Sequence, residues 1–157
     1  MGEVLDRTEA VRRRAAARVL RKTFVFTNGC FDVLHVGHVA LLAEAKRLGH
    51  VLIVGVNSDR SVRALKGEGR PLQDESSRAT ILAAMRDVDL VVVFDEDTPL
   101  EIIQELEPDV LVKGADYTAD EVVGKSQVEA AGGRVVLVPL VPDRSSSRIL
   151  SRLGAAP

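Results

Sequence analysis

The chain carries the stretch Thr27-Asn28-Gly29-Cys30-Phe31-Asp32-Val33-Leu34-His35-Val36-Gly37-His38 directly after an apolar run. The run at 23–27 is β-branched and aromatic, which is typical of a buried parallel strand, and apolar residues recur at helical spacing from 39 to 45. The two histidines therefore fall where a strand becomes a helix. Such a junction exposes unpaired backbone N–H groups and the positive end of a helix dipole, so the stretch predicts an anion site.

His35 and His38 lie close to one face of the first helical turn, where both imidazoles can donate hydrogen bonds to the same phosphate chain. Gly37, between them, lets a ligand approach the backbone closely. A single histidine beside an apolar helix is more often a packed or solvent-facing side chain. Two of the chain's three histidines occur here, in the pattern H-x-G-H directly after a strand, and this favours the phosphate interpretation.

The composition predicts one soluble α/β domain. The chain has 157 residues, enough to bury a sizeable core, and 46% of them are hydrophobic while only 3% are aromatic. Such a core suits layers of helices on a sheet. The net charge of −2 gives no general electrostatic case for a nucleic-acid partner. No apolar run approaches the roughly 20 residues that cross a bilayer. The start has no signal-peptide layout and the single cysteine cannot form an internal disulfide, so we expect a cytoplasmic protein.

Apolar runs alternate with amphipathic segments after residue 22 and predict a doubly wound, Rossmann-like domain over 23–157. The five expected strands are 23–27, 51–56, 90–94, 109–112 and 134–138. Right-handed crossovers would give a five-stranded parallel sheet with helices on both faces and ligand loops at the carboxyl ends of the strands. Residues 1–22 are assigned to a basic N-terminal helix, whose charges are interpreted as a solvated face rather than a nucleic-acid contact.

Four further stretches carry polar residues with possible ligand roles. Lys66 and Arg70 lie in a charged loop that either reaches phosphate groups or is merely solvated. Arg78 falls in the first turns of the next expected helix, where the dipole disfavours a cation, which suggests a nearby anion. The serines 145–147 open a terminal helix and offer more donors than capping requires. The acidic residues 95–97 could bind a divalent metal, but contiguous side chains cannot all point one way, so we interpret them as a solvated turn.

The stretch 27–38 resembles the signature of the HxGH nucleotidyltransferases, a doubly wound superfamily whose members join phosphorylated small molecules to a nucleoside monophosphate. From residue 23 onward the chain looks similar to the heptose 1-phosphate adenylyltransferase family. The segments that carry this similarity are 54–59, 66–67 with 70–71, 92–100, 109–117 and 139–142. Some members are fused to a sugar kinase, for which this chain has no room, so it resembles the stand-alone form.

The resemblance implies roles for individual residues. Those expected to bind the nucleotide or its phosphates are Thr27, Asn28, Gly29, Phe31, Gly37, Arg78, Ser145, Ser146 and Ser147. Those expected to take part in catalysis are His35, His38 and Lys66. Those expected to bind the sugar phosphate are Asp32, Lys113 and Asp116. No metal ligand is assigned. The family more commonly has Ser-Thr-Thr at 145–147 and a Gly-aromatic pair at 143–144, and the second departure leaves the local backbone shape and a substrate contact open.

The resemblance further implies a reaction: transfer of AMP from ATP to D-glycero-β-D-manno-heptose 1-phosphate, with Mg²⁺ bound mainly through the substrate phosphates. A homodimer is also implied. The signature cannot distinguish this activity from a CTP-dependent cytidylyltransferase for a phosphorylated alcohol or sugar, or from a flavin adenylyltransferase, although residues 97–99 and 113–117 favour the heptose family. A nucleotide-binding module without turnover is the non-enzymatic alternative, and the intact H-x-G-H pattern argues against it. Neither a nucleic-acid partner nor a membrane partner is expected.

Overall fold

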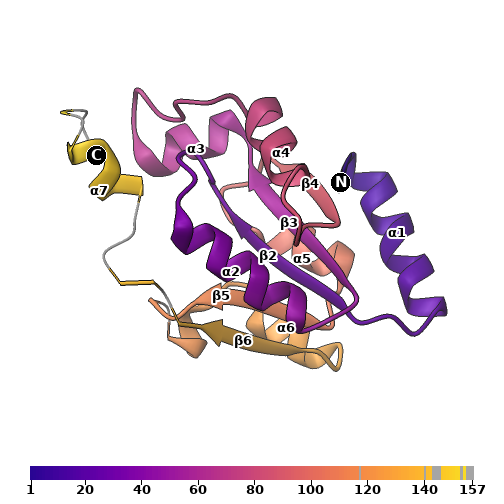
Figure 1. Ribbon diagram of the computed structural model, residues 1–157. Coiled ribbons are helices and arrows are strands. Elements are labelled where there is room, and N and C mark those ends of the chain that lie inside the picture. The colour runs from indigo at the N-terminus through magenta and orange to yellow at the C-terminus, as the bar shows by residue number, and fades with distance from the viewer. Residues whose placement is uncertain (117, 140, 143–145, 153, 155–157) are drawn as a thin grey trace.

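Strand β2 (Phe24–Gly29) is largely buried on both faces, as expected for the centre of a parallel sheet. The computed structural model describes residues 1–116, 118–139, 141–142, 146–152 and 154, and within these ranges six strands form one parallel sheet in the order β1-β4-β3-β2-β5-β6. The chain moves from β2 outward to β3 and β4 and then crosses to the other side for β5 and β6 (Figure 1). The order therefore reverses between β2 and β5, the position at which doubly wound sheets bind ligands.

The remaining elements alternate along the chain as the sequence predicts. The other strands are β1 (Glu3–Leu5), β3 (Val51–Asn57), β4 (Leu90–Phe94), β5 (Val110–Gly114) and β6 (Arg134–Val138). The helices are α1 (Arg7–Val19), α2 (Val36–Arg47), α3 (Asp59–Lys66), α4 (Glu75–Ala83), α5 (Leu100–Leu106), the 3₁₀ turn η1 (Ala119–Glu121), α6 (Lys125–Ala130) and α7 (Ser146–Arg152). Over the described ranges, no helix is both long and apolar enough to cross a membrane.

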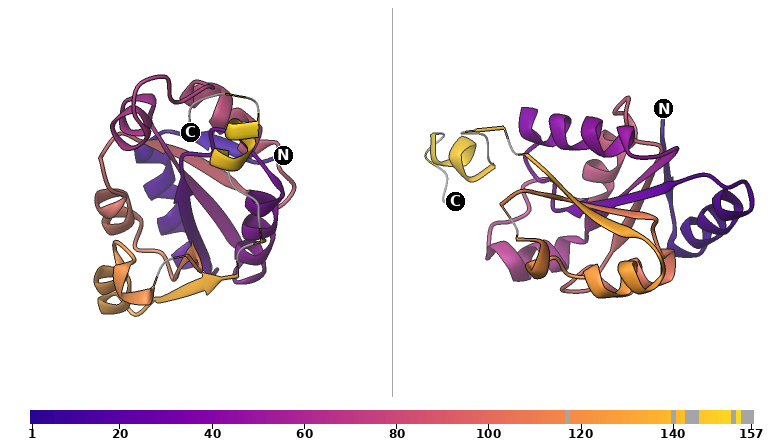
Figure 2. Two further views of the ribbon diagram at one scale, coloured as in Figure 1. Left: turned by 90° about the vertical axis from the view of Figure 1, so that its left-hand side faces the viewer. Right: turned by 90° about the horizontal axis from the view of Figure 1, so that it is seen from below.

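Two apolar layers flank the sheet because successive side chains of a strand point to opposite faces. On one face, Val25 belongs to a buried cluster with Leu42 of α2 and Leu82 of α4. On the other face, Phe26 belongs to a second buried cluster with Ile102 of α5. The right-hand view of Figure 2 shows α2 on one side of the sheet and α6 on the other. The predicted α/β fold, a parallel sheet with helices on both faces, is confirmed.

The sheet has six strands rather than the five predicted, because β1 adds an edge strand beside β4. Its backbone pairs with β4 from Glu3 opposite Leu90 to Leu5 opposite Val92, and the N–H of Glu3 donates to Asp89 O at 2.9 Å. Just before the strand, the N–H of Gly2 donates to Ala83 O at the end of α4, at 2.7 Å. Three residues with mostly exposed side chains show no apolar period, so the sequence pattern does not reveal this strand.

Helix α1 is the predicted basic helix, but one of its arginines is buried. The side chain of Arg14 is only 6% exposed and donates to both carboxylate oxygens of Asp109, at 2.8 and 3.1 Å. The interpretation of the basic cluster as a solvated face is therefore wrong for Arg14. Its position, four residues after Ala10 and three before Ala17, puts it on the same inward stripe as these buried alanines.

The segment 119–131 does not form one continuous helix. Residues 119–121 form η1, and α6 begins only at Lys125. Gly124, between them, has a φ of +89°, in the left-handed region, and a Cβ at this position would lie 2.8 Å from Cδ1 of Ile103. Glycine is required here by both conformation and space. The break leaves Val122 and Val123 as a linker at the carboxyl edge of the sheet, where they line a cavity.

Candidate active site

A cavity of about 470 Å³ opens at the carboxyl edge of the sheet, where the strand order reverses. Its floor includes Asn28 and Gly29 of β2, Asn57 of β3 and Lys113 of β5. Its walls come from residues 30–32, His38, 65–66, Arg70, 97–99, 122–123 and Ser146. Because the strands are parallel, their carboxyl ends and the loops that follow them converge on one edge, which is where ligands bind in such sheets.

Most of the site residues predicted from the sequence meet at this cavity. Those that line it are Asn28, Gly29, Phe31, Asp32, His38, Lys66, Lys113 and Ser146. The described candidates that do not line it are Thr27, His35, Gly37, Arg78 and Asp116. Ser145 and the side chain of Ser147 lie outside the described residues.

His35 caps helix α2 and stacks on His38. Its Nδ1 accepts a hydrogen bond from the N–H of Gly37 at 3.1 Å, so this nitrogen carries no proton and His35 donates through Nε2. The two imidazole centroids are 3.9 Å apart, with 25° between the ring planes. The ring of Phe31 lies 5.1 Å from that of His38 on a tilted plane. The first turn of α2 thus holds both histidines in a fixed arrangement beside the signature loop, residues 27–38.

Both imidazoles are neutral at pH 7. Burial lowers the pKa of His38 to about 4, with a further contribution from His35, and burial also lowers the pKa of His35. The Nδ1 atom of His38 is buried without a hydrogen-bond partner among the described residues. A neutral imidazole can donate one hydrogen bond but brings no net charge. Charge neutralisation at the cavity therefore falls to the lysine and arginine side chains.

Lys113 lies at the floor of the cavity, next to the signature loop. Its Nζ donates to Oδ1 of Asn28 at 2.5 Å, which joins the ends of β5 and β2. Burial lowers the pKa of Lys113 to about 8, although the charges of Asp116 and Cys30 oppose the shift. Lys113 is therefore mostly protonated at pH 7 and can attract a substrate anion, but it loses its charge under mildly basic conditions.

Two of the predicted phosphate-binding residues, Thr27 and Arg78, donate their side-chain hydrogen bonds to other protein groups. Thr27 is fully buried, and its hydroxyl donates to the carbonyl of Val112 at 3.0 Å, which ties β2 to β5. The side chain of Arg78 is 0% exposed. Its donors bind the carbonyl oxygens of Cys30, Asn57 and Gln73 at 2.7, 2.7 and 2.9 Å and the carboxylate of Asp59 at 2.7 Å. Arg78 thus holds the signature loop, the end of β3, the start of α3 and the start of α4 together.

Asp32 connects the signature loop to the segment that follows Lys66. Its carboxylate is 1% exposed and accepts from Nε of Arg70 at 2.7 Å and from the N–H groups of Leu72 and Gln73 at 2.8 and 3.1 Å. The family resemblance implies that Asp32 binds the sugar phosphate. The structure places it in the cavity wall with its carboxylate already bound to the protein.

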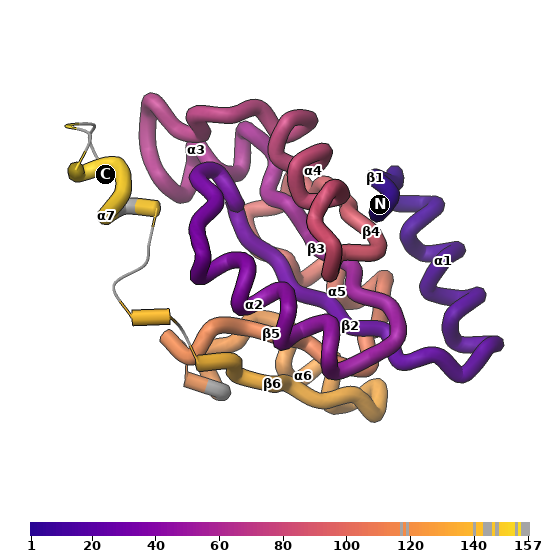
Figure 3. Tube along the Cα trace, viewed as in Figure 1, coloured from indigo at the N-terminus to yellow at the C-terminus, as the bar shows by residue number. Residues whose placement is uncertain are grey.

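Lys66 and Ser146 bring two further elements to the cavity. Lys66 is exposed at the last position of α3. Ser146 begins α7, and its hydroxyl donates to the carbonyl of Val33 at 3.0 Å, across a sequence separation of 113 residues. Figure 3 shows α3 and α7 at the same end of the molecule as the start of α2. Of the three terminal serines, Ser146 therefore contacts the signature loop in the described structure.

Four polar cavity residues fall outside the predicted set: Asn57, Arg70, Asp97 and Thr98. The sequence leaves open whether Arg70 reaches phosphate groups or is merely solvated, and the structure brings Arg70 and Asn57 to the cavity. The position of Asn57, at the carboxyl end of a strand beside β2, was a usable signal. Thr98 follows a strand in the same way, but in a loop whose direction no pattern predicts.

The acidic turn 95–97 pairs with arginines. Asp95 and Asp97 accept from Arg60 at 3.0 and 3.2 Å, and Glu96 pairs with Arg7. In the described part of the chain, no three metal-ligating side chains lie together. The carboxylates of this turn are therefore bound by arginines of α1 and α3.

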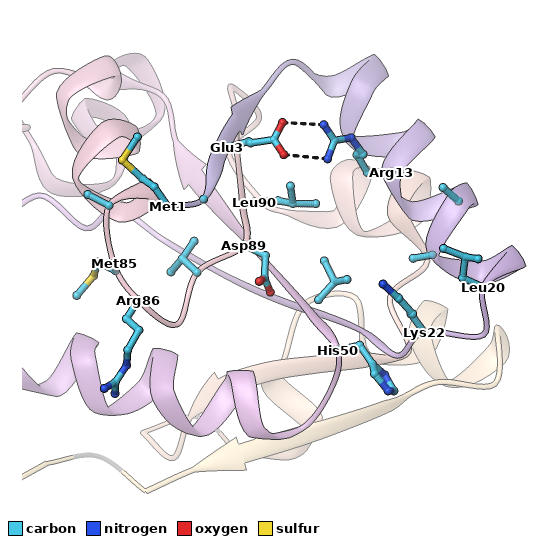
Figure 4. Close-up of a pocket in the computed structure, with 16 residues that line it drawn as sticks. Met1, Glu3, Arg13, Leu20, Lys22, His50, Met85, Arg86, Asp89 and Leu90 are labelled. Carbon is cyan, nitrogen blue, oxygen red and sulfur yellow. Dashed lines mark hydrogen bonds and ion pairs between the residues drawn. The ribbon is translucent and has the colours of Figure 1, made fainter.

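A larger hollow of about 780 Å³ lies at the amino edge of the sheet, between α1 and the turn before β4. Several of its polar side chains already have partners: Glu3 pairs with Arg13 (Figure 4), Asp89 accepts from Lys46, and His50 Nδ1 accepts from the backbone. None of the described site candidates lines it. The cavity at the carboxyl edge, which gathers the signature loop, is therefore the candidate active site.

Comparison with known proteins agrees with this assignment. The chain is 58% identical over 148 residues to a bifunctional protein HldE of Syntrophotalea carbinolica, covering 94% of this chain and 29% of that protein. A bifunctional protein HldE of Mesorhizobium japonicum is 54% identical over 152 residues, with 97% of this chain and 31% of that protein covered. The chain thus spans less than a third of the length of these relatives.

Two solved structures are similar. A lipopolysaccharide core biosynthesis protein from Thermoplasma volcanium is 31% identical with a TM-score of 0.63, over 76% of this chain and 97% of that one. A pantoate-beta-alanine ligase from Francisella tularensis, 15% identical with a TM-score of 0.61 over 94% of this chain and 69% of that one, shares the fold. The family model described as cytidylyltransferase-like matches residues 26–152, from the signature loop to α7. The predicted relation to the nucleotidyltransferases is confirmed: this chain belongs to the cytidylyltransferase-like family.

Proposed function

We propose that this chain transfers AMP from ATP to D-glycero-β-D-manno-heptose 1-phosphate and releases pyrophosphate. The observation that carries the proposal is the stacked His35–His38 pair beside a cavity that also contains Lys66 and Lys113. The nucleotidyl-transfer class follows from the family. The choice of acceptor is supported by the relatives named bifunctional protein HldE and by residues 97–99 and Lys113, which line this cavity and match the heptose-family pattern in the sequence.

The reaction is an in-line displacement at the α-phosphorus of ATP. An oxygen of the sugar phosphate forms the new P–O bond, and the bond to pyrophosphate breaks with its electron pair going to the leaving group. The attacking phosphate is already anionic at neutral pH, so the step requires no general base. The protein's task is to hold two anions in line and to offset the negative charge that grows on pyrophosphate.

The cavity residues divide this task by their charge. His35 and His38, neutral in the free protein, donate hydrogen bonds to phosphate oxygens. Lys66 and Lys113 supply positive charge from α3 and from β5. Mg²⁺, when bound with the nucleotide, draws negative charge from the phosphate oxygens. We assign no protein ligand to it, because no ligand cluster is found in the described part of the chain.

A nucleotide-by-acceptor matrix scored by pyrophosphate release tests the proposal. ATP and CTP are each combined with heptose 1-phosphate, glycerol 3-phosphate and FMN, and we expect turnover with ATP and heptose 1-phosphate. Release with CTP, or with ATP and FMN, would replace the proposal with a cytidylyltransferase or a flavin adenylyltransferase. Nucleotide binding without release for any acceptor would indicate a binding module.

The histidine pair has its own test in the same assay. His38→Ala removes a donor to the phosphates and should lower kcat by about 100-fold or more, as loss of a preorganised donor does in other enzymes. His50→Ala, at the amino edge of the sheet, is the matched control and should keep wild-type turnover. Wild-type turnover in His38→Ala would refute the role given to the pair.

We also propose, from the resemblance alone, that the protein is a cytoplasmic homodimer. Light scattering would measure its mass.

A further inference from the structure

Arg70 is buried in the cavity wall although the loop that carries it is exposed. Residues 66–69 are exposed, whereas Arg70 is only 7% exposed. Gly67 and Gly69 adopt φ angles of +91° and +85°, and the N–H of Arg70 donates to the carbonyl of Gly67 at 3.3 Å. These left-handed positions turn the chain back on itself. The loop therefore brings a guanidinium from the surface into the cavity that Lys66 also lines.

Asp32 fixes the orientation of this guanidinium. Nε of Arg70 donates to Oδ2 of Asp32 at 2.7 Å, while Oδ1 accepts from the N–H groups of Leu72 and Gln73. The carboxylate is thus held by three donors, two of them backbone groups with no freedom to rotate away. A guanidinium is planar, so anchoring its Nε to a fixed acceptor also fixes the directions of its other N–H groups.

The Nη1 and Nη2 groups of Arg70 remain available to the cavity. Over the ranges that the structure describes, the one hydrogen-bonding partner of the Arg70 side chain is Asp32, through Nε. The fully buried polar atoms without a partner in those ranges are Nη2 of Arg7 and Nδ1 of His38, so the Nη groups of Arg70 are not sealed inside the protein. Four N–H donors in a rigid fork, at the wall of a cavity, match two oxygens of a phosphate group.

We propose that Arg70 is a substrate-binding residue that donates to two oxygens of a phosphate group, and that Asp32 is the positioning residue which holds its guanidinium. The inference rests on the proposed function in taking the ligand to be a phosphate compound. That phosphate belongs either to the triphosphate of the nucleotide or to the acceptor. Lys66, in the same cavity wall, adds a point charge, so one loop supplies two cations of different geometry.

Binding measured without turnover tests Arg70 directly. Wild type, Arg70→Met and Arg70→Lys are titrated by calorimetry with Mg²⁺-ATP and, separately, with heptose 1-phosphate. We expect Arg70→Met to weaken at least one of the two ligands by about 10- to 100-fold, and Arg70→Lys to recover only part of it, since lysine has no fork. Glu68→Gln, an exposed carboxylate of the same loop, is the matched control and should bind as wild type. If Arg70→Met loses affinity for ATP, the phosphate that Arg70 binds belongs to the triphosphate. If it loses affinity for the sugar, Arg70 binds the acceptor phosphate.

A double variant separates binding from loop folding. Asp32→Asn/Arg70→Met removes both buried charges, so it avoids the unpaired carboxylate that Arg70→Met leaves. If Arg70 binds the anion, the double variant binds the ligand no better than Arg70→Met does. Asp32→Asn alone then loses less affinity than Arg70→Met. Restored affinity in the double variant, or unchanged affinity for both ligands in Arg70→Met, would overturn the proposal. If wild type binds ATP but releases no pyrophosphate with the sugar, the proposed function fails. The ATP titration would still show whether Arg70 binds the triphosphate.

Discussion

Lys113 illustrates how burial gives a residue a property that its position in the sequence does not predict. The sequence places it after a strand, in a loop that faces a substrate. In the structure its ammonium is held by Asn28 at the cavity floor, and burial lowers its pKa to about 8. A lysine whose pKa lies this low changes charge near physiological pH.

This shift predicts a basic limb in the pH–rate profile. Lys113 is charged below about pH 8 and loses its proton as pH rises through that value, so kcat/KM for the two anionic substrates should fall above pH 8. Lys113→Arg keeps its charge and should remove this limb, while Lys113→Met should be slow at every pH. Steady-state rates from pH 6 to 10 measure it. A wild-type profile as flat as that of Lys113→Arg would rule out Lys113 as the titrating group.

The sequence predicts which residues come near the cavity better than it predicts what they bind. Asn28, His38, Lys66 and Lys113 follow from motif and strand order, because the loops after parallel strands meet at one edge. The use of the Asp32 carboxylate does not follow, since it depends on N–H groups about 40 residues along the chain, whose direction is set by tertiary folding. An acidic residue in a signature looks the same in sequence whether it binds substrate or its own backbone.

At the scale of elements, α1 is fastened to the sheet by one buried arginine. Nε and Nη2 of Arg14 donate to the carbonyl of Glu107, the C-terminal cap of α5, and both Nη groups donate to Asp109. The guanidinium carbon also lies 5.4 Å from the ring centroid of Phe24, close enough for a cation–π contact. Asp109 in turn accepts from the N–H of Phe24 at 2.7 Å. Helix α1, the end of α5 and the start of β2 thus share one polar cluster.

Breaking this cluster should destabilise the fold without touching the chemistry. Arg14→Met removes the donor to the carbonyls of Leu106 and Glu107 and leaves the half-exposed Asp109 without its ion-pair partner, so we expect a loss of about 2–3 kcal/mol in the free energy of unfolding. Arg12→Met, on the exposed side of the same helix, should change it by less than about 0.5 kcal/mol. Urea denaturation measures both, and kcat of the folded Arg14→Met protein should match wild type. Equal stability of the two variants would show that the polar cluster around Arg14 does not stabilise the fold.

The elements also show the limits of pattern reading. Five strands are evident as apolar runs because a central parallel strand is buried on both faces. Strand β1 is three residues long and joins the sheet through its backbone, so no side-chain period exists to detect. Arg14 could have been recognised, since it stands on one stripe with Ala10 and Ala17. The break before α6 depends on the left-handed Gly124, and a glycine inside an amphipathic segment does not by itself end a helix.

At the scale of the whole molecule, the two apolar clusters and the polar cavity divide the sheet between them. The clusters cover its two faces, and the polar side chains gather where the strand order reverses. The histidine pair lies on this boundary, packed against Phe31 of one cluster yet at the rim of the cavity. The burial that orients His38 for a ligand also makes its protonation unfavourable. The protonation state of His38 therefore affects the stability of the entire fold.

That coupling predicts how the protein responds to acid. Burial lowers the pKa of His38 to about 4, against 6.5 for an ordinary histidine, so from pH 6.5 down to 4 the unfolded chain binds a proton that the folded chain does not. Stability should therefore fall as pH falls through this window, by on the order of 2 kcal/mol after allowing for the partial exposure of the ring. Carboxyl groups whose pKa is lowered, such as the helix cap Asp74, lose their contribution mainly below this window, as pH falls through their own pKa values.

A variant that cannot titrate isolates this contribution. His38→Gln retains a hydrogen-bond donor but takes up no proton, so its free energy of unfolding should decline less than that of wild type between pH 6.5 and 4, with Arg12→Met as a control that follows wild type. Urea denaturation at half-unit pH steps gives the two curves. The curves for wild type and His38→Gln should run parallel above pH 7 and diverge as the pH falls below about 6.5. Parallel curves across the whole range would show that His38 takes its proton equally well folded and unfolded, and the neutral-imidazole account of phosphate binding would lose its basis.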